Sequence, residues 1–151
     1  MSGSNGTTAR DVDWLVAGLA NDVPGVREVV LVSSDGLMLA SARGADAADA
    51  RTDAEEHLGA IVSGLVALAE GTSRVLDMGA VRQEIVTMAE GYVVAMSISD
   101  GSCLGVHASG SADLGVIAYQ MTSFVRRAGH VLTPALRAQM HQDRGGGRVG
   151  S

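Results

Sequence analysis

The residues most suggestive of chemistry in this chain are its single cysteine, Cys103, and a histidine four positions later, His107. A thiol beside an imidazole can act as an activated nucleophile. Both residues fall in one apolar run that predicts a strand over 102–108, and four residues along a strand span about 13 Å. The two side chains would share a face of the strand without touching. The pattern therefore favours a buried thiol and a packed or surface histidine over a catalytic pair.

Other residue types that carry chemistry are absent or scattered. The chain has no lysine among its 11 basic residues, which excludes Walker-A lysines and lysine Schiff bases. His57, His130 and His141 lie on different predicted helices or helix ends, without a carboxylate at the spacing of a metal site. No glycine-rich phosphate loop follows a predicted strand. We therefore predict no catalytic residue, no metal ligand and no cofactor.

Composition narrows the class of protein further. The chain has 151 residues, of which 46% are hydrophobic and 3% aromatic, as expected for one domain with an aliphatic core. Its net charge of −6 and scattered arginines disfavour a nucleic-acid partner. One cysteine fits a reducing, cytoplasmic setting. No signal-peptide core and no uncharged run near the roughly 20 apolar residues of a membrane span occur, so we expect a soluble protein without direct membrane insertion.

An α/β pattern must position these residues. Small turn-forming pairs between apolar runs predict tight hairpins at Asp35-Gly36, Glu90-Gly91 and Asp100-Gly101. The strands around them should cover 26–33, 37–40, 81–88, 92–98 and 102–108, the first of them central because residues 29–32 are apolar on both faces. Apolar residues at helical spacing predict helices from Asp11, from about Asp53 to Glu70, after Gly110, and from Thr133-Pro134.

One domain should hold all of these elements, over residues 9–142. Residues 1–8 are small and polar, and residues 143–151 form a Gly/Arg tail, so both ends should be flexible. The spacing of Thr52-Asp53-Ala54-Glu55 is that of a capping box, which predicts the start of the long helix.

The long helix is unusual because it carries no charge between His57 and Glu70. At 100° per residue its bulky residues form one face, namely Leu58, Ile61, Val62, Leu65, Leu68 and Ala69. Its small residues form the opposite face, namely Ala60, Ser63, Gly64 and Ala67. A helix lying on a monomeric sheet should expose polar residues, so the small face predicts a subunit or partner contact. Cover by another helix of the same chain is the alternative.

A second contact surface is expected at a sheet edge. The strand over 81–88 is the most polar of the five, which places it at the edge, where it could extend the sheet across a two-fold axis. Its residues complete the predicted dimer or partner interface: Val81, Arg82, Gln83, Glu84, Ile85, Val86, Thr87 and Met88.

The order of elements, with Val23-Pro24-Gly25-Val26 and Ser34-Asp35-Gly36, resembles the roadblock / dynein light chain domain over about residues 11–141. Three further motifs look more narrowly like the roadblock component of actinobacterial conserved operons. These are Val81-Arg82-Gln83, Asp100-Gly101-Ser102-Cys103-Leu104 and Leu132-Thr133-Pro134-Ala135-Leu136-Arg137.

The resemblance implies a profilin-like, three-layer α-β-α fold with a five-stranded antiparallel sheet. It also implies a homodimer in which the strands at 81–88 join two sheets and the long helices lie side by side. Such proteins serve as platforms for Ras-like small GTPases, and a relative stimulates GTP hydrolysis without donating an arginine. The implied partners are a second copy, a Ras-like GTPase and a sensor kinase-like protein of the same operon, with membrane association through partners.

Two other classes of function compete with the platform hypothesis. A small-ligand sensory domain is one, because such a sheet can hold a ligand pocket and Gly105, without a side chain, could leave room for a ligand. Few polar groups converge in the apolar segments, which disfavours it. A cysteine-dependent enzyme is disfavoured by the strand geometry of Cys103 and His107.

Overall fold

The computed structural model describes residues 2–45 and 54–149, and within them four helices and five strands. They follow one another as α1 (Ser2–Asp22), β1 (Val26–Val32), β2 (Met38–Arg43), α2 (Ala54–Leu76), β3 (Glu84–Met88), β4 (Gly91–Ser97), β5 (Cys103–Ser109), α3 (Leu114–Ala128) and α4 (Pro134–Val149). The predicted order of elements is confirmed.

The five strands form one antiparallel sheet in the order β2-β1-β5-β4-β3. The strand placed at an edge by its polarity, β3, is at the edge. β1 was expected to be central; it is interior and almost wholly buried, and β5 lies beside it at the centre of the sheet. The five-stranded antiparallel sheet of the predicted fold class is confirmed.

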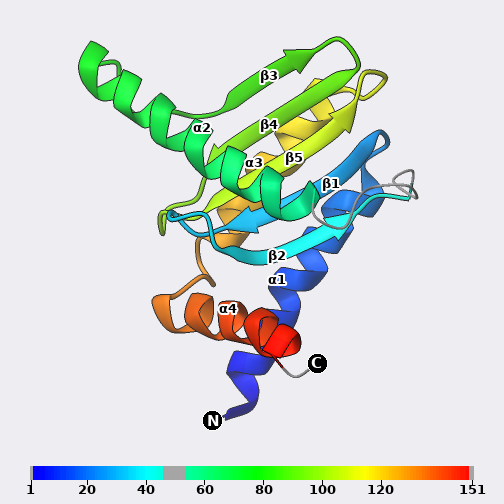
Figure 1. Cartoon of the computed structure of the whole chain (residues 1–151), viewed down its shortest axis with the longest axis vertical. Helices are drawn as coiled ribbons and strands as arrows, with labels where there is room; N and C mark the ends of the chain where they lie inside the picture. The colour runs from blue at the N-terminus through cyan, green and yellow to red at the C-terminus, as the bar shows by residue number, and fades with distance from the viewer. Residues whose placement is uncertain (1, 46–53, 150–151) are drawn as a thin grey trace.

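Helices cover the two faces of the sheet unequally. Figure 1 shows α1 and α3 behind the sheet, α2 alone in front of it, and α4 below, against β2 and α1. The protein has one hydrophobic core on each face of the sheet, and side chains of β5 alternate between them. Leu104 and Val106 pack with α1 and α3, whereas Cys103 packs with α2. The α2 core is the smaller of the two and is built mainly from valines.

Two of the three predicted turn glycines adopt the expected backbone conformation. Gly36 and Gly101 have φ of 87° and 93°, values that favour glycine. A hairpin does form near Gly91, but Gly91 was wrongly predicted to be a turn residue. It is the first residue of β4 and pairs with Met88 across a turn made by Ala89 and Glu90. A Cβ at Gly91 would lie 2.4 Å from the carbonyl oxygen of Ala108, so close strand approach requires the glycine.

The helices are longer than the sequence pattern predicted. α1 begins at Ser2, α2 continues six residues past Glu70 to Leu76, and α4 runs to Val149. Once a packed segment has nucleated a helix, each added residue gains a hydrogen bond, so ends without an apolar stripe can still be helical. The flexibility expected for residues 1–8 and 143–151 stays a prediction. The capping box at Thr52 lies outside the described residues.

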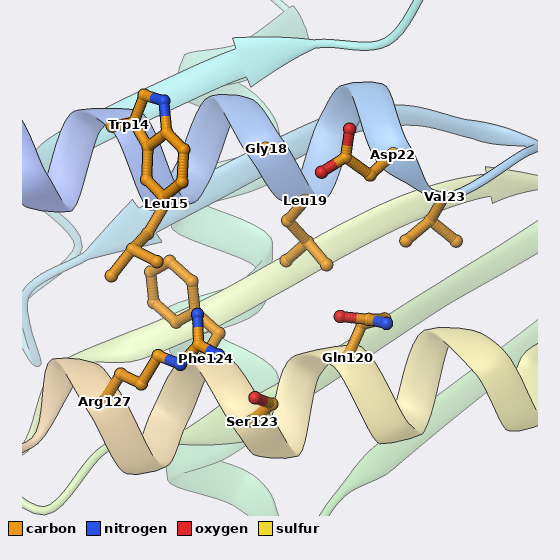
Figure 2. A pocket seen from close by; sticks show the side chains of 10 residues that line it. All are labelled: Trp14, Leu15, Gly18, Leu19, Asp22, Val23, Gln120, Ser123, Phe124 and Arg127. Carbon is orange, nitrogen blue, oxygen red and sulfur yellow. The ribbon is translucent and has the colours of Figure 1, made fainter.

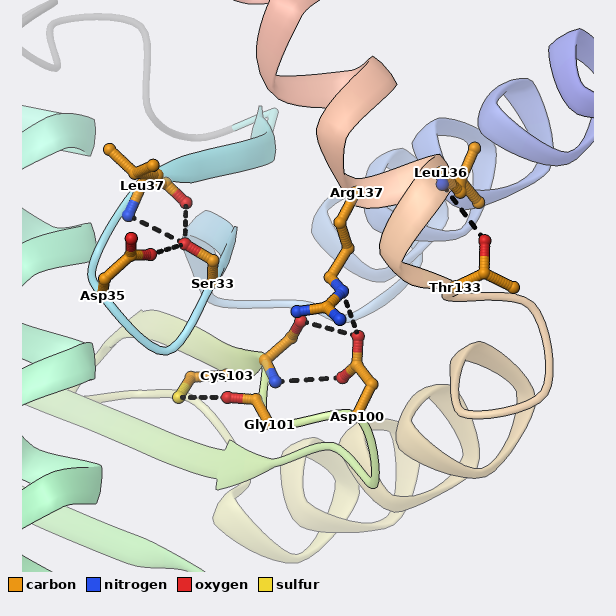
Figure 3. A network of polar contacts seen from close by, with 10 residues as sticks. Ser33, Asp35, Leu37, Asp100, Gly101, Cys103, Thr133, Leu136 and Arg137 are labelled. Carbon is orange, nitrogen blue, oxygen red and sulfur yellow. Dashed lines mark hydrogen bonds and ion pairs between the residues drawn. The ribbon is translucent and has the colours of Figure 1, made fainter.

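Two sequence motifs meet where α4 joins the sheet (Figure 3). Asp100 accepts hydrogen bonds from the backbone N–H and the hydroxyl of Ser102, both at 2.9 Å. The carboxylate so oriented forms an ion pair with Arg137 of α4, with Nε 3.1 Å from Oδ2. Thr133 caps the same helix by accepting from the N–H of Leu136 at 3.1 Å, as predicted. These contacts tie α4 to the turn between β4 and β5.

By length and composition, α2 is apolar enough to cross a membrane, and it is the one such helix among the described residues. No uncharged run of that length was expected from the sequence. In this fold one side of α2 is packed on the sheet through Leu58, Val62 and Val66. The opposite side is therefore the candidate surface for contacts with other proteins.

Candidate interaction surface

The sheet-facing side of α2 is held unusually close to the strands by two glycines. A Cβ at Gly59 of α2 would lie 2.9 Å from Val32, and a Cβ at Gly105 of β5 would lie 2.3 Å from Val62. Both distances are below ordinary van der Waals contact, so only glycine permits this approach. Gly105 therefore makes room for α2 itself and leaves no space for a ligand there.

Polar contacts fix the rotation of α2 about its axis. Glu55 in its first turn pairs with Arg43 of β2 at 2.9 Å and accepts a hydrogen bond from Ser41 at 2.8 Å. Next to Val62, at the middle of the sheet contact, Ser63 donates to the carbonyl oxygen of Ser34 at 3.0 Å. Both contacts are made to β2 or to the turn that precedes it, and they hold the remaining side of the helix in a defined orientation toward solvent.

That outer side is apolar, and no described helix covers it (Figure 1). Ala60, Gly64 and Ala67 are exposed as predicted, and a Cβ at Gly64 would meet no atom within 4 Å. Ile61 and Leu68, assigned to the bulky, buried face, are 55% and 73% exposed instead. That assignment was wrong, and because both side chains are exposed, the outer side of α2 is more apolar than expected.

The cause of this error is the position of the buried stripe. The sheet contacts Leu58, Val62 and Val66, a strict i, i+4, i+8 row that rotates the centre of the buried face away from Ile61 and Leu68. Val66 was assigned to neither face from the sequence. Its i+4 spacing from Val62 was the signal that could have placed it on the buried face.

Apolar side chains of α2 are also exposed past the sheet, beyond Glu70 and Arg74. In Figure 1 the last turns of α2 extend beyond β3, and Val75 there is 85% exposed. Leu76 and Met78 are also exposed, and the helix ends at Leu76, before Asp77, which has a positive φ of 53°. This overhang was not predicted from the sequence, because the helix was expected to end at Glu70. Large apolar side chains on a helix that leaves its own sheet are typical of a protein contact.

The neighbouring edge strand adds a second part to the surface. Among the strands that the structure describes, β3 pairs only with β4, so its other edge carries backbone groups without a strand partner. Ile85 and Met88 are exposed on it, and Val86 packs under α2. Of the predicted interface residues, Val81, Arg82 and Gln83 precede the strand, and Ser63 is half-buried by its bond to Ser34.

A carboxylate lies in this surface without a donor. Both oxygens of Glu84, the first residue of β3, are buried and have no hydrogen-bond partner among the described residues. Burial raises the pKa of the Glu84 carboxyl, and the nearby charge of Glu70 raises it further. A buried carboxylate without a hydrogen-bond donor destabilises the folded chain. A partner that supplies a donor or a proton to Glu84 on binding would therefore be stabilised there.

Cys103 and His107 are arranged as the sequence predicted, with both on β5, where Cys103 is buried and His107 half-buried. Burial raises the pKa of the Cys103 thiol to about 11, with the charges of Glu70, Glu84 and Asp100 adding to the effect. The thiol is therefore protonated near neutrality and is a poor nucleophile. No group of three or more possible metal ligands occurs within residues 2–45 and 54–149.

Comparison with known proteins identifies the fold and the family. The model of the Roadblock/LC7 domain matches residues 12–108. A solved Roadblock/LC7 domain from Streptomyces avermitilis is 33% identical, with a TM-score of 0.68 over 76% of this chain and 92% of that chain. MglB of Myxococcus xanthus is 15% identical, with a TM-score of 0.70 over 80% of this chain and 94% of that one. A search of curated proteins finds no match.

Profilin IB of Acanthamoeba castellanii shares the fold at 14% identity, with a TM-score of 0.54 over 78% of this chain and 96% of that chain. The profilin-like architecture expected from the sequence is thus confirmed. The chain belongs to the Roadblock/LC7 domain family.

Proposed function

We propose that this protein is a non-catalytic, homodimeric platform for a Ras-like small GTPase, and that it stimulates GTP hydrolysis by shaping the partner's own site. One observation carries the proposal: the outer side of α2, charge-free between His57 and Glu70, is uncovered and lies beside an unpaired edge strand. Beyond the exposed Arg74, the helix also presents Val75 and Leu76 to solvent. The family supplies the kind of partner, because the sequence resembles roadblock proteins that serve GTPases.

The second copy is proposed to occupy the overhang, the edge and the centre of the outer side of α2 at Gly64, where the two long helices would lie side by side. Two β3 edges related by a two-fold axis can pair their free backbone groups and join the sheets. The exposed Val75 and Leu76 would then be covered by the other copy. The rest of the α2 surface, around Ala60 and Ala67, would form the GTPase platform.

Two competing readings lose support. The ligand-sensor alternative depended on space beside Gly105, which Val62 fills. The cysteine-enzyme alternative needs a thiolate, and the raised pKa of Cys103 opposes one. We propose a cytoplasmic location, with any membrane association provided through partners such as a sensor kinase-like protein.

The test uses a Ras-like small GTPase, purified in GDP- and GTP-analogue-bound forms, and the proposal places its gene in the same operon. The proposal expects binding to the dimer and faster single-turnover GTP hydrolysis, with Cys103→Ser and His107→Ala variants within a few-fold of wild type. A fall of about 10²-fold or more in either variant would indicate a catalytic side chain instead. Absence of binding to both nucleotide forms would refute the platform.

A further inference from the structure

We propose that the groove between α1 and α3, on the face of the sheet opposite α2, is a second docking site, and that its occupant is an amphipathic helix of a partner protein carrying an apolar anchor and an acidic end. This site lies away from the proposed GTPase platform and does not depend on it.

The groove is formed by two helices that run in opposite directions (Figure 2). Leu15, Leu19 and Val23 of the α1 region and Phe124 of α3 supply an apolar lining around a cavity of about 120 Å³. Small-ligand sites are typically about 300 Å³ or more, so this hollow suits one or two inserted side chains rather than a cofactor.

A glycine keeps the groove open without being needed by the fold. Gly18 lies on α1 in the middle of the lining, and a Cβ there would meet only the Asp22 carboxylate, at 3.6 Å. Glycine inside a helix costs about 0.5–1 kcal/mol relative to alanine. Since neither backbone conformation nor packing requires Gly18, its effect is to leave space between the helices.

Two large aromatic side chains lie beside the opening of the groove and are exposed in the single chain. Trp14, the only tryptophan of the chain, is 72% exposed at one end of the groove. Tyr119 is exposed on α3, next to the groove residue Gln120. Tryptophan, tyrosine and arginine are the residues most enriched at the energetic centres of protein interfaces.

The charges of the groove select the occupant. Arg127 lies at the Trp14 end and Asp22 at the other, as Figure 2 shows. Arg127 forms no ion pair with another described residue, and Arg126 beside it adds a second positive charge. A groove between two helices accepts a third helix by its apolar face. Electrostatic complementarity then favours an acidic residue at the Arg127 end.

The test is a selection from a displayed library of amphipathic helical peptides, carried out on the full chain. Clones retained by wild type and rejected by Gly18→Leu, which fills the hollow, are sequenced and synthesised. We expect an apolar residue at one position and Asp or Glu toward one end. Binding should shift the emission of Trp14, which reports on this groove alone because the chain has no other tryptophan.

Binding of the selected peptides should weaken about tenfold or more in Gly18→Leu and in Arg127→Glu. It should stay unchanged in Asn21→Leu, a matched apolar addition at an exposed position of α1 outside the lining. Failure to recover any clone that distinguishes wild type from Gly18→Leu would overturn the proposal. So would clones indifferent to Arg127→Glu, or a change of oligomeric mass in Gly18→Leu, which would make a second copy the occupant.

The same variants separate this site from the GTPase platform. Gly18→Leu should bind the small GTPase as wild type does. Loss of GTPase binding would instead show that the groove is part of that platform and would overturn its assignment as a second, independent site.

Discussion

Gly105 illustrates how one residue of the central strand decides the distance between α2 and the sheet. A methyl group in its place would lie 2.3 Å from Val62. We predict that Gly105→Ala lowers the free energy of unfolding by about 1–3 kcal/mol, because α2 must move outward to relieve the overlap. Urea unfolding followed by circular dichroism measures it.

Gly18→Ala is the matched control for that experiment. The same added methyl meets only the Asp22 carboxylate there, at an ordinary contact distance of 3.6 Å, so helix propensity should make it neutral or stabilising by up to about 1 kcal/mol. Equal destabilisation of both variants would contradict the packing argument, and an unchanged Gly105→Ala would return the space beside β5 to the ligand-sensor reading.

Glu84 should give the protein a distinctive pH dependence. Its carboxyl pKa is raised in the folded state, so between the ordinary pKa and the raised one the folded protein binds more protons than the unfolded chain. The contribution of Glu84 to the free energy of unfolding therefore favours the folded state at lower pH and is lost as pH rises through the raised pKa. We predict that Glu84→Gln increases stability at neutral pH and that its advantage over wild type shrinks toward mildly acidic pH.

Unfolding curves at a fixed protein concentration, taken from neutral to mildly acidic pH, measure this difference. Glu90→Gln removes the same charge at an exposed turn position and is the control. A Glu84→Gln advantage that is constant with pH, or that matches Glu90→Gln, would contradict the assignment.

At the scale of an element, α2 shows what sequence patterns do and do not determine. Its existence, its lack of charge and the exposure of Ala60, Gly64 and Ala67 were predictable from composition and period. The exposure of Ile61 and Leu68 was not, because the packing contact with Gly105 and Gly59 fixes which row faces the sheet. That contact joins residues distant in sequence, which a helical wheel cannot represent.

The role of α2 as a platform can be separated from its role in dimerisation. We predict that Ala60→Glu and Ala67→Glu weaken GTPase binding about tenfold or more while the dimer stays intact, since a charge desolvated at an interface costs several kcal/mol. Ala138→Glu, at an exposed position of α4, should change neither quantity. Calorimetry and light scattering measure the two.

Each contrary result has a defined meaning. Dissociation of the dimer by the α2 variants would assign the whole small-residue surface to the subunit contact and refute the platform position. An intact dimer with unchanged GTPase affinity would move the docking site to another surface, such as residues 125–137.

At the scale of the whole molecule, the element order and the edge position of β3 were predictable from the sequence, since hairpin glycines and apolar periods are local signals. The family was predicted from the resemblance of short motifs. The overhang of α2 and the groove beside Gly18 arise only when separate elements are placed in space. The exposed Trp14 was detectable in principle, because it falls outside the apolar stripe of Val12, Leu15 and Val16 on its helix.

The most direct test of the account is the mass in solution of wild type and of Gly64→Arg. Gly64 has no atom within 4 Å of a built Cβ, so the folded monomer can accept arginine, whereas a close contact between two α2 helices cannot. Light scattering at micromolar concentration should give twice the 15.4 kDa chain mass for wild type and the monomer mass for Gly64→Arg, with Ala138→Arg remaining dimeric. A monomeric wild type, or a dimer unaffected by Gly64→Arg, would contradict the account.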